Sequence, residues 1–398
     1  MDWTLYIQLS AMMFLQYAIW GAWAPVLGAH LLGPLKMSGK QTGWIYAALP
    51  MACMISPFIG GQMADRWIST QWVLAASHLA GGVVLLFAAR QRKFPGLFAL
   101  MCVYSFLYSS TVSLTNSLMF VQMKGHQLSD MQAGLMRVWG TIGWIVAGLG
   151  LVLWRRTRKE PGRSSDCLNL TAVISLVMGT LCLFLPNTPP TPGGETAFLK
   201  ALKMLGEPQF LIFVIISFVV TTELQFYYVP TAAFLEDLGV KTKNVSGVMT
   251  IAQFAEIIGM VVLWPWAFSA LPKESLWRWV LAIGVIAWPM RYIVFAIMRP
   301  LRLVMGSLAF HGIGYTFFFF AGQKYVDTVA PDDIKASAQA LIFGVTLGLG
   351  NFIGTQFTGV ILDHFKTPEG KFRWRPIFLI PCALTIACAI AFLLFFRG

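Results

Sequence analysis

Long apolar stretches recur along the whole chain and are separated by short polar connections. Each stretch has about the 20 residues that a membrane-spanning helix needs, and a helix satisfies its own backbone hydrogen bonds in lipid. The pattern therefore predicts an all-α membrane protein with about twelve spanning helices. Their approximate ranges are 5–31, 41–64, 71–90, 95–120, 128–154, 168–186, 209–236, 244–270, 276–298, 301–323, 334–362 and 375–396.

The connection between the sixth and seventh stretches is the longest polar interruption, and it is rich in proline and glycine. We therefore expect an N-terminal six-helix bundle over 1–186, a cytoplasmic linker over 187–208 and a C-terminal six-helix bundle over 209–398. A short internal similarity between 14–17 (FLQY) and 223–226 (ELQF) favours two related halves. Many secondary transporters are built from such halves and hold their substrate at mid-membrane.

Composition supports the membrane assignment. Hydrophobic residues make up 57% of the 398 and charged residues 12%, against roughly 25% charged in a soluble domain. The net charge of +12 comes from basic residues in short loops rather than on one extended face, so nucleic acid is not an expected partner and anionic lipid is. The six cysteines lack metal-ligand spacing, and we expect no metal and no cofactor.

Enzyme signatures are missing from the sequence. It contains no G-x-x-x-x-G-K-[ST] loop, no H-E-x-x-H and no G-x-S-x-G. We therefore expect a protein that is not an enzyme, and any uphill transport must draw on an ion gradient.

Charged residues inside the apolar stretches are the main functional signal. Arg137, Glu223 and Glu256 each lie near the middle of a predicted span. A charged side chain at this depth costs at least about 2.5–3.5 kcal/mol, so it usually faces a polar cavity or a partner. These residues therefore indicate a pathway through the membrane.

The fifth span places a polar and aromatic face on one side of its helix. Arg137, Thr141 and Trp144 recur at helical spacing, so they share a face that offers donors, a hydroxyl and a ring. The alternative is that Arg137 is a structural ion-pair partner for a glutamate elsewhere.

The seventh and eighth spans add amides and acids. Gln253 and Glu256 are three residues apart and share a face, whereas Glu223 and Gln225 diverge by about 200° and cannot both face one ligand. We expect Gln225 in the cavity and Glu223 in packing or at the interface between the repeats.

Glu256 is the stronger candidate for carrying a proton, because removal from water disfavours an ionised carboxylate. The alternative is a permanently ionised Glu256 paired with Arg137 or Arg291. In the tenth span His311 and Tyr315 lie one turn apart, which suits hydrogen bonding and ring stacking. His311 could equally be a packed core residue.

The loop after the second span reads Gly61-Gln62-Met63-Ala64-Asp65-Arg66. It resembles the G-x-x-x-D-R loop of the major facilitator superfamily, in which Asp65 and Arg66 can act as a conformational latch between helices. The alternative is an ordinary charge pair at a helix end. The resemblance puts this loop and both termini in the cytoplasm, although Lys and Arg number roughly eighteen on the opposite side and roughly nine on this one.

At these residues the chain resembles the nucleoside:proton symporter family of the major facilitator superfamily. The similarity runs through most of the length, in several separate motifs that keep the same order. They are FLQYAIWGAW, ADRWISTQWVLAASH, RVWGTIGW, ELQ, AQFAE and IKASAQALIFGVTLGLGNFIG.

The resemblance implies the major facilitator fold and import of nucleosides with protons, by alternating access, across the bacterial cytoplasmic (inner) membrane. We expect the protein to be a monomer. The resemblance also implies nucleoside contacts from residues that keep the family's type, namely Arg137, Thr141, Gln225, Gln253 and Glu256. Two other classes stay open: a transporter of another small polar solute, such as a sugar or metabolite, and a membrane sensor that does not transport.

Four further pocket positions depart from the family pattern. Trp144 replaces a phenylalanine, Tyr228 an asparagine, His311 a tyrosine and Tyr315 a phenylalanine. In addition, Thr316 stands where the family has an aspartate. Proton coupling is therefore expected to rest on Glu256 or His311, or to be absent.

Overall fold

The computed structural model of the protein is all-helical in the residues it describes. Those residues are 3–32, 34–157, 165–191, 196–368 and 371–397. Within them the only β-type pairing is an isolated bridge between Lys366 and Phe372, and there is no strand. The predicted all-α class is confirmed. Part of the predicted linker, 192–195, lies outside the described residues.

Ten helices of the described chain are long and apolar enough to cross a membrane. The predicted count of about twelve is not confirmed. The two remaining predicted spans correspond to α1 (Trp3–Trp23) and α8 (Asp166–Cys182). Two glutamines and five tryptophan and tyrosine residues make α1 less apolar, and α8 has 17 residues, the lower end of the range of about 17–25 that can span.

The chain forms two compact units. The first unit comprises Met1–Leu202 and Ala330–Gly344, and the second comprises Lys203–Val329 and Val345–Gly398. The short segment Ala330–Gly344 thus packs with the first unit, although the chain on both sides of it belongs to the second.

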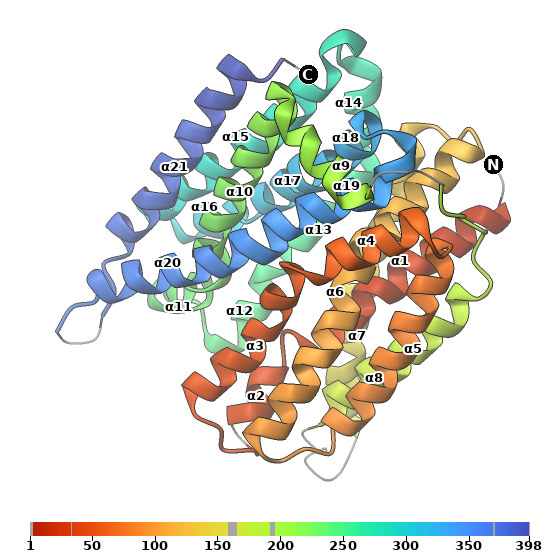
Figure 1. The fold of residues 1–398 in the computed structure, drawn as a ribbon. Helices are drawn as coiled ribbons and strands as arrows, with labels where there is room; N and C mark the ends of the chain where they lie inside the picture. The colour runs from red at the N-terminus through yellow and green to blue at the C-terminus, as the bar shows by residue number, and fades with distance from the viewer. Residues whose placement is uncertain (1–2, 33, 158–164, 192–195, 369–370, 398) are drawn as a thin grey trace. The chain divides into compact units, whose positions relative to one another are not determined.

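The helices of the first unit follow one another from the N-terminus, with one late addition from the C-terminal half of the sequence (Figure 1). They are α1, α2 (Leu27–Leu32), α3 (Gly39–Cys53), α4 (Ser56–Arg66), α5 (Thr70–Ala88), α6 (Phe94–Gly125), α7 (Asp130–Thr157), α8, η5 (Asp332–Ile334) and α19 (Lys335–Phe343), with α9 (Ala197–Lys203) at the boundary.

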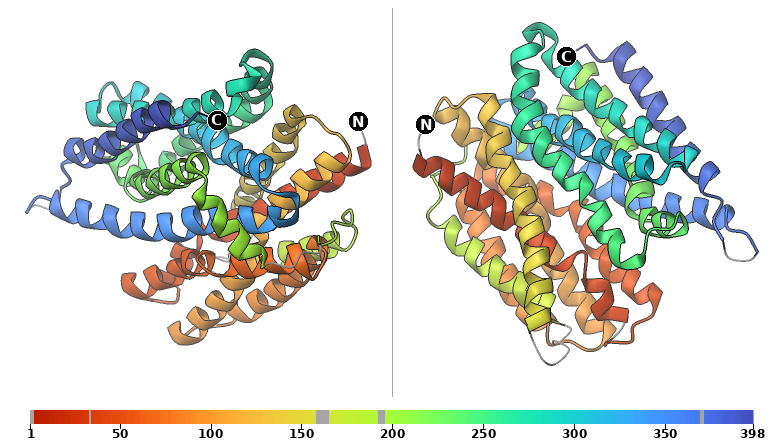
Figure 2. Two further views of the ribbon diagram at one scale, coloured as in Figure 1. Left: turned by 45° about the horizontal axis from the view of Figure 1, so that its top comes forward. Right: turned by 180° about the vertical axis from the view of Figure 1, so that it is seen from behind.

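A buried polar network holds α1 in the first unit. Gln16 donates from Nε2 to Thr111 Oγ1 of α6 (2.9 Å), so its Oε1 accepts from Nε2 of His78 on α5 (3.0 Å). The hydroxyl of Tyr108 on α6 donates to the Gln16 carbonyl at 2.8 Å. Three helices are therefore tied through one glutamine, and α5, α6 and α8 run side by side next to it (Figures 1 and 2).

The second unit contains more and shorter helical segments. They are η1 (Met204–Gly206), α10 (Pro208–Tyr228), α11 (Thr231–Asp237), α12 (Thr242–Met249), α13 (Ile251–Ile258), η2 (Gly259–Leu263), α14 (Trp264–Ala270), η3 (Lys273–Ser275), α15 (Leu276–Ile297), α16 (Leu301–Ser307), α17 (Ala309–Gly314), η4 (Tyr315–Phe320), α18 (Ala321–Val329), η6 (Gly344–Gly350), α20 (Asn351–His364) and α21 (Trp374–Phe395).

Three of these segments, η2, η4 and η6, are π-helical. A π-helical turn holds an extra residue and rotates the side chains that follow it, and such turns are frequent at functional sites. The predicted span 244–270 corresponds to the candidate membrane span Gly247–Ala270, which runs through the end of α12, a turn at Thr250, and α13, η2 and α14 in succession. The segments η2 and η4 directly follow the helices that carry Glu256 and His311.

Candidate functional site

Arg137 of α7 is buried in the first unit, with 1% of its surface exposed. Its guanidinium carbon lies 4.0 Å from the centre of the Tyr17 ring of α1, a cation–π contact. Gly140, less than one turn along α7, leaves the room for this contact. A Cβ at position 140 would lie 2.6 Å from Arg137 Nη1 and 2.7 Å from Cδ2 of Tyr17.

The predicted face of α7 is present in the structure. Thr141 is buried and Trp144 is half-buried, one and two turns beyond Arg137. The Trp144 ring packs edge-to-face on Trp20 of α1, with ring centres 5.7 Å apart. A Cβ on Gly21 would lie 2.8 Å from the Trp144 backbone, so α1 and α7 meet almost backbone to backbone.

In the second unit, α13 and α17 bring two predicted site residues together. Glu256 is buried on α13 and His311 is buried on α17. The helices approach closely because residue 312 is glycine: a Cβ there would lie 2.5 Å from the Ala252 carbonyl oxygen. Thr316, just beyond, donates its hydroxyl to the Glu256 carbonyl at 3.4 Å. Gln253 is half-buried on the same helix as Glu256.

Aromatic rings surround His311. The imidazole stacks on Tyr227, with centres 4.3 Å apart and planes 23° from parallel, and it meets the edge of Tyr228 at 5.7 Å. Tyr228 is 51% exposed, whereas Tyr315 is half-buried one turn beyond His311. His311, Tyr227 and Tyr228 therefore form an aromatic group in this unit, whereas the Tyr315 ring packs on Phe319, with ring centres 5.8 Å apart.

The side chain of Gln225 forms its hydrogen bonds with α20 and not with this aromatic group. Its side chain is buried, donates from Nε2 to Asn351 Oδ1 of α20 at 2.8 Å, and accepts from the Thr355 hydroxyl at 3.4 Å. Gln16 and Gln225, which occupy matching places in the internal similarity, thus both bond a polar side chain of a neighbouring helix. In this structure the Gln225 amide is engaged with α20.

Asp65 caps a helix that is distant in the sequence. Its carboxylate accepts the backbone N–H groups of Ala336 (3.1 Å) and Ser337 (2.8 Å) in the first turn of α19. The residue that precedes α19, Ile334, has no side-chain acceptor, so Asp65 supplies the missing cap and an anion at the positive helix end. A Cβ on Gly61 would lie 3.0 Å from Ser337 Cα, so a glycine is needed for α4 to approach.

Arg66 binds the turn just before α19. Its guanidinium donates to the Asp333 carboxylate (3.1 Å), to the Asp333 carbonyl (2.8 Å) and to the Thr191 carbonyl (2.9 Å). Lys200 adds a second cation at 2.7 Å from the other Asp333 oxygen. Asp65 and Arg66 thus hold successive parts of the segment 333–337.

One further buried cation, Arg291, is not among the predicted site residues. Arg291, in the middle of α15, is fully buried, and its Nη1 lies 3.1 Å from Nδ1 of His311. The rule that singles out charges in apolar spans applies to Arg291 as much as to Arg137. From the sequence alone, Arg291 is expected only as an alternative partner of Glu256.

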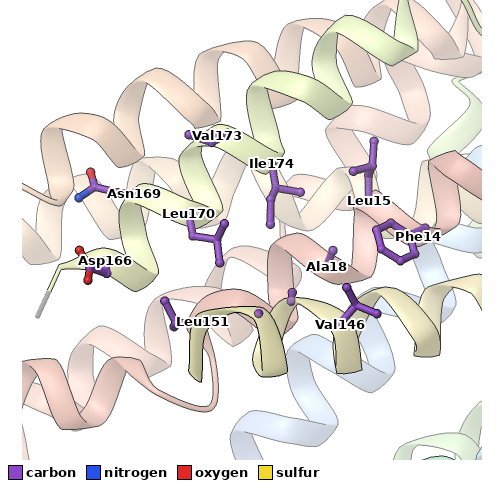
Figure 3. Close-up of a pocket in the computed structure, with 12 residues that line it drawn as sticks. Phe14, Leu15, Ala18, Val146, Leu151, Asp166, Asn169, Leu170, Val173 and Ile174 are labelled. Atoms are coloured by element: carbon purple, nitrogen blue, oxygen red, sulfur yellow. The ribbon is translucent and has the colours of Figure 1, made fainter. Parts of the chain in front are cut away.

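A groove of about 560 Å³ lies among α1, α7 and α8 of the first unit. None of the predicted site residues lines it. Figure 3 shows apolar side chains such as Phe14, Leu170 and Ile174 along its length, with Asp166 and Asn169 at one end. Its apolar lining suits hydrocarbon better than a polar solute.

Known proteins are similar to this chain along nearly its full length. A family model described as nucleoside H⁺ symporter matches residues 3–398. The putative nucleoside transporter YegT of Escherichia coli K12 is 32% identical, over 98% of this chain and 93% of its own. Nucleoside permease NupG of the same organism is 26% identical, over 99% and 96%.

Solved structures of transporters have a similar fold. The crystal structure of NupG superposes with a TM-score of 0.70 at 26% identity and covers all of both chains. The proton:xylose symporter XylE of the major facilitator superfamily superposes with a TM-score of 0.72 at 12% identity, over 100% of this chain and 97% of its own, a likeness in fold alone.

Proposed function

The chain belongs to the nucleoside H⁺ symporter family and is a multi-pass membrane transporter with the major facilitator fold, and from this premise we propose how it binds its substrates. We propose that it imports nucleosides with protons by alternating access across a bacterial cytoplasmic membrane, with both termini in the cytoplasm. The observation that carries this proposal is the family match over residues 3–398.

Two sets of residues contact the nucleoside. The first set, Arg137, Thr141 and Trp144, shares one face of α7. The second set comes from α10, α13, α17 and η4, and consists of Gln225, Tyr228, Gln253, Glu256, His311 and Tyr315. Burial supports a functional reading of Arg137 and Glu256, because a charge away from water needs a partner or a ligand.

The chemistry of these residues suits a nucleoside. Glu256 and Gln253 supply acceptors and donors for sugar hydroxyls, while the rings of Trp144, Tyr228 and Tyr315 suit a flat base. Glu256 and His311 are the titratable members that can couple proton movement to nucleoside movement. Asp65 and Arg66 act as the conformational latch, through the contacts with 333–337 described above.

Uptake of labelled uridine into cells or proteoliposomes tests the proposal. We expect accumulation that an imposed proton gradient drives, a protonophore abolishes, and unlabelled adenosine or uridine inhibits by competition. Uridine binding without flux would contradict transport of nucleosides, and inhibition by a sugar but not by adenosine would assign another solute.

A further inference from the structure

The second unit contains a buried acid that the proposed nucleoside site does not use. Glu223, on α10, is fully buried, and neither of its carboxylate oxygens has a hydrogen-bond partner among the described residues. An ionised carboxylate without donors is strongly disfavoured away from water. This arrangement therefore suits a Glu223 that carries a proton.

Arg291, on α15, is the buried cation that could pair with this acid. Both residues contact Tyr292: its hydroxyl donates to the Glu223 carbonyl at 3.0 Å, and the Arg291 guanidinium lies over its ring. Arg291 Nε and Nη2 nevertheless have no hydrogen-bond partner among the described residues. The guanidinium lies in an aromatic cage, 4.5 Å from the ring centres of Tyr227 and Tyr292 and 5.0 Å from that of Trp288. Arg291 thus has two nitrogens to offer to an ionised Glu223.

The contact between Arg291 and His311 fixes the protonation of the histidine. A guanidinium only donates hydrogen bonds, so Nδ1 of His311, 3.1 Å from Arg291 Nη1, must accept. His311 is therefore neutral here and carries its hydrogen on Nε2. A proton on Nδ1 would remove this hydrogen bond and place a second positive charge beside Arg291.

We propose that Glu223 is a proton-binding site, additional to Glu256, whose charge decides whether Arg291 binds His311. When Glu223 is protonated, Arg291 donates to His311, as in this structure. When Glu223 loses its proton to water, the carboxylate draws the guanidinium to itself and releases Nδ1 of His311. Only an O–H bond forms or breaks, and the charge of the Glu223–Arg291 pair alternates between +1 and zero.

The inference rests on the proposed function, because it connects the proton to the nucleoside through His311. The imidazole is a member of the second set and stacks on Tyr227 beside Tyr228. Release of its Nδ1 would change both its hydrogen bonding and its orientation. The protonation of Glu223 would thereby alter the side chains that contact the nucleoside.

Within the part of the chain that the structure describes, no other group around Glu223 is suited to this role. The Tyr292 hydroxyl donates to the Glu223 carbonyl at 3.0 Å, and tyrosine and cysteine are ordinarily uncharged near neutral pH. The acidic and basic residues of α20 lie only in its last turn. Among the described residues, the titratable groups around the pair are Tyr227 and Tyr228 of α10, Tyr292 of α15, Cys382 and Cys388 of α21 and His311 of α17, and those in the last turn of α20 are Asp363 and His364.

The test compares Glu223→Gln with Glu207→Gln in the full-length protein reconstituted in proteoliposomes. Glu207 is exposed at the start of the same helix, so its replacement is a matched control. Three quantities are measured: uridine binding, uridine counterflow without a gradient, and proton uptake that accompanies uridine entry. We expect Glu223→Gln to keep binding and counterflow within a few-fold of wild type but to lose proton uptake and gradient-driven accumulation. Glu207→Gln should behave as wild type.

Wild-type accumulation and proton uptake in Glu223→Gln would overturn the inference. Should that variant fail to fold, Glu223→Asp decides, since it keeps an acid but moves it one methylene from its present place. We then expect a shifted pH for half-maximal accumulation, and an unchanged pH profile would overturn the inference. If the wild-type protein took up uridine without proton uptake, both the proposed coupling and this inference would be overturned. If proton uptake accompanied uridine entry in both the wild type and Glu223→Gln, only this inference would be refuted.

Discussion

At the scale of single residues, glycine 140 determines where the Arg137 guanidinium can lie. The space that a Cβ would occupy is filled by Arg137 Nη1 and the Tyr17 ring. We predict that Gly140→Ala displaces the guanidinium and weakens uridine binding, because overpacking of this kind costs about 1–3 kcal/mol. Isothermal titration on the purified protein measures the loss.

Gly148→Ala is the control for this change. It lies on the same helix, and a Cβ there meets nothing within 4 Å. Its affinity for uridine should equal that of wild type. Equal affinity in Gly140→Ala would mean that the position of Arg137 does not matter for the nucleoside.

Glu256→Gln separates binding from coupling at the proposed acid. The amide keeps the size of the side chain but cannot release a proton, so we predict that accumulation against a gradient is lost while some binding remains. Labelled uridine uptake with and without a proton gradient, together with equilibrium binding, measures both. Full proton-driven uptake by this variant would remove Glu256 from the coupling mechanism.

The charges of the site were predictable from sequence, but their partners were not. Arg137 and Glu256 stand out because a charge inside an apolar stretch is costly. The Tyr17 ring beneath Arg137 and the His311 nitrogen beside Arg291 come from other helices. Such contacts depend on how helices pack, which helical spacing within one stretch does not encode.

At the scale of helices, the close contact of α13 with α17 depends on Gly312. A Cβ at this position would strike the α13 backbone, which cannot yield as a side chain can. We predict that Gly312→Ala pushes the helices apart, lowers the Tm of the purified protein and weakens uridine binding, since Glu256 and His311 lie on these two helices. The corresponding control is Gly306→Ala on α16, where a Cβ meets nothing within 4 Å. A Tm as high as that of the control would contradict the packing argument.

The capping of α19 by Asp65 gives a second prediction at this scale. Asp65→Ala leaves the N–H groups of Ala336 and Ser337 without their acceptor, a loss worth about 0.5–2 kcal/mol. We expect faster hydrogen exchange in the first turn of α19 and a changed rate of uridine transport. Asp363→Ala, exposed at the end of α20, should alter neither. Unchanged exchange at 336–337 would refute the capping role.

Helix positions were predictable where the apolar stretch is uninterrupted. The prediction of 276–298 matches α15 (Leu276–Ile297), and 375–396 matches α21 (Trp374–Phe395). The interruption at Thr250 and the π-helical turns η2 and η4 were not predictable, because their residues are as apolar as those of regular helices. Their geometry follows from contacts with other helices.

At the scale of the whole protein, the substrate itself can test the proposed contacts. If Glu256 and Gln253 bind the ribose, a missing 2′-hydroxyl leaves buried polar groups unpaired at about 1–3 kcal/mol each. We predict that 2′-deoxyuridine inhibits uridine uptake roughly 5- to 150-fold less strongly than uridine does. Equal inhibition by the two nucleosides would show that these residues do not read this hydroxyl.

The membership of α19 in the first unit has a consequence for the gene. If the coding sequence were cut within the linker, the first product would end without α19, and Asp65 and Arg66 would have no helix to hold. Only the second product could supply that helix. Co-expressed fragments should therefore recognise each other through it, and neither fragment alone should yield the first unit in its complete form.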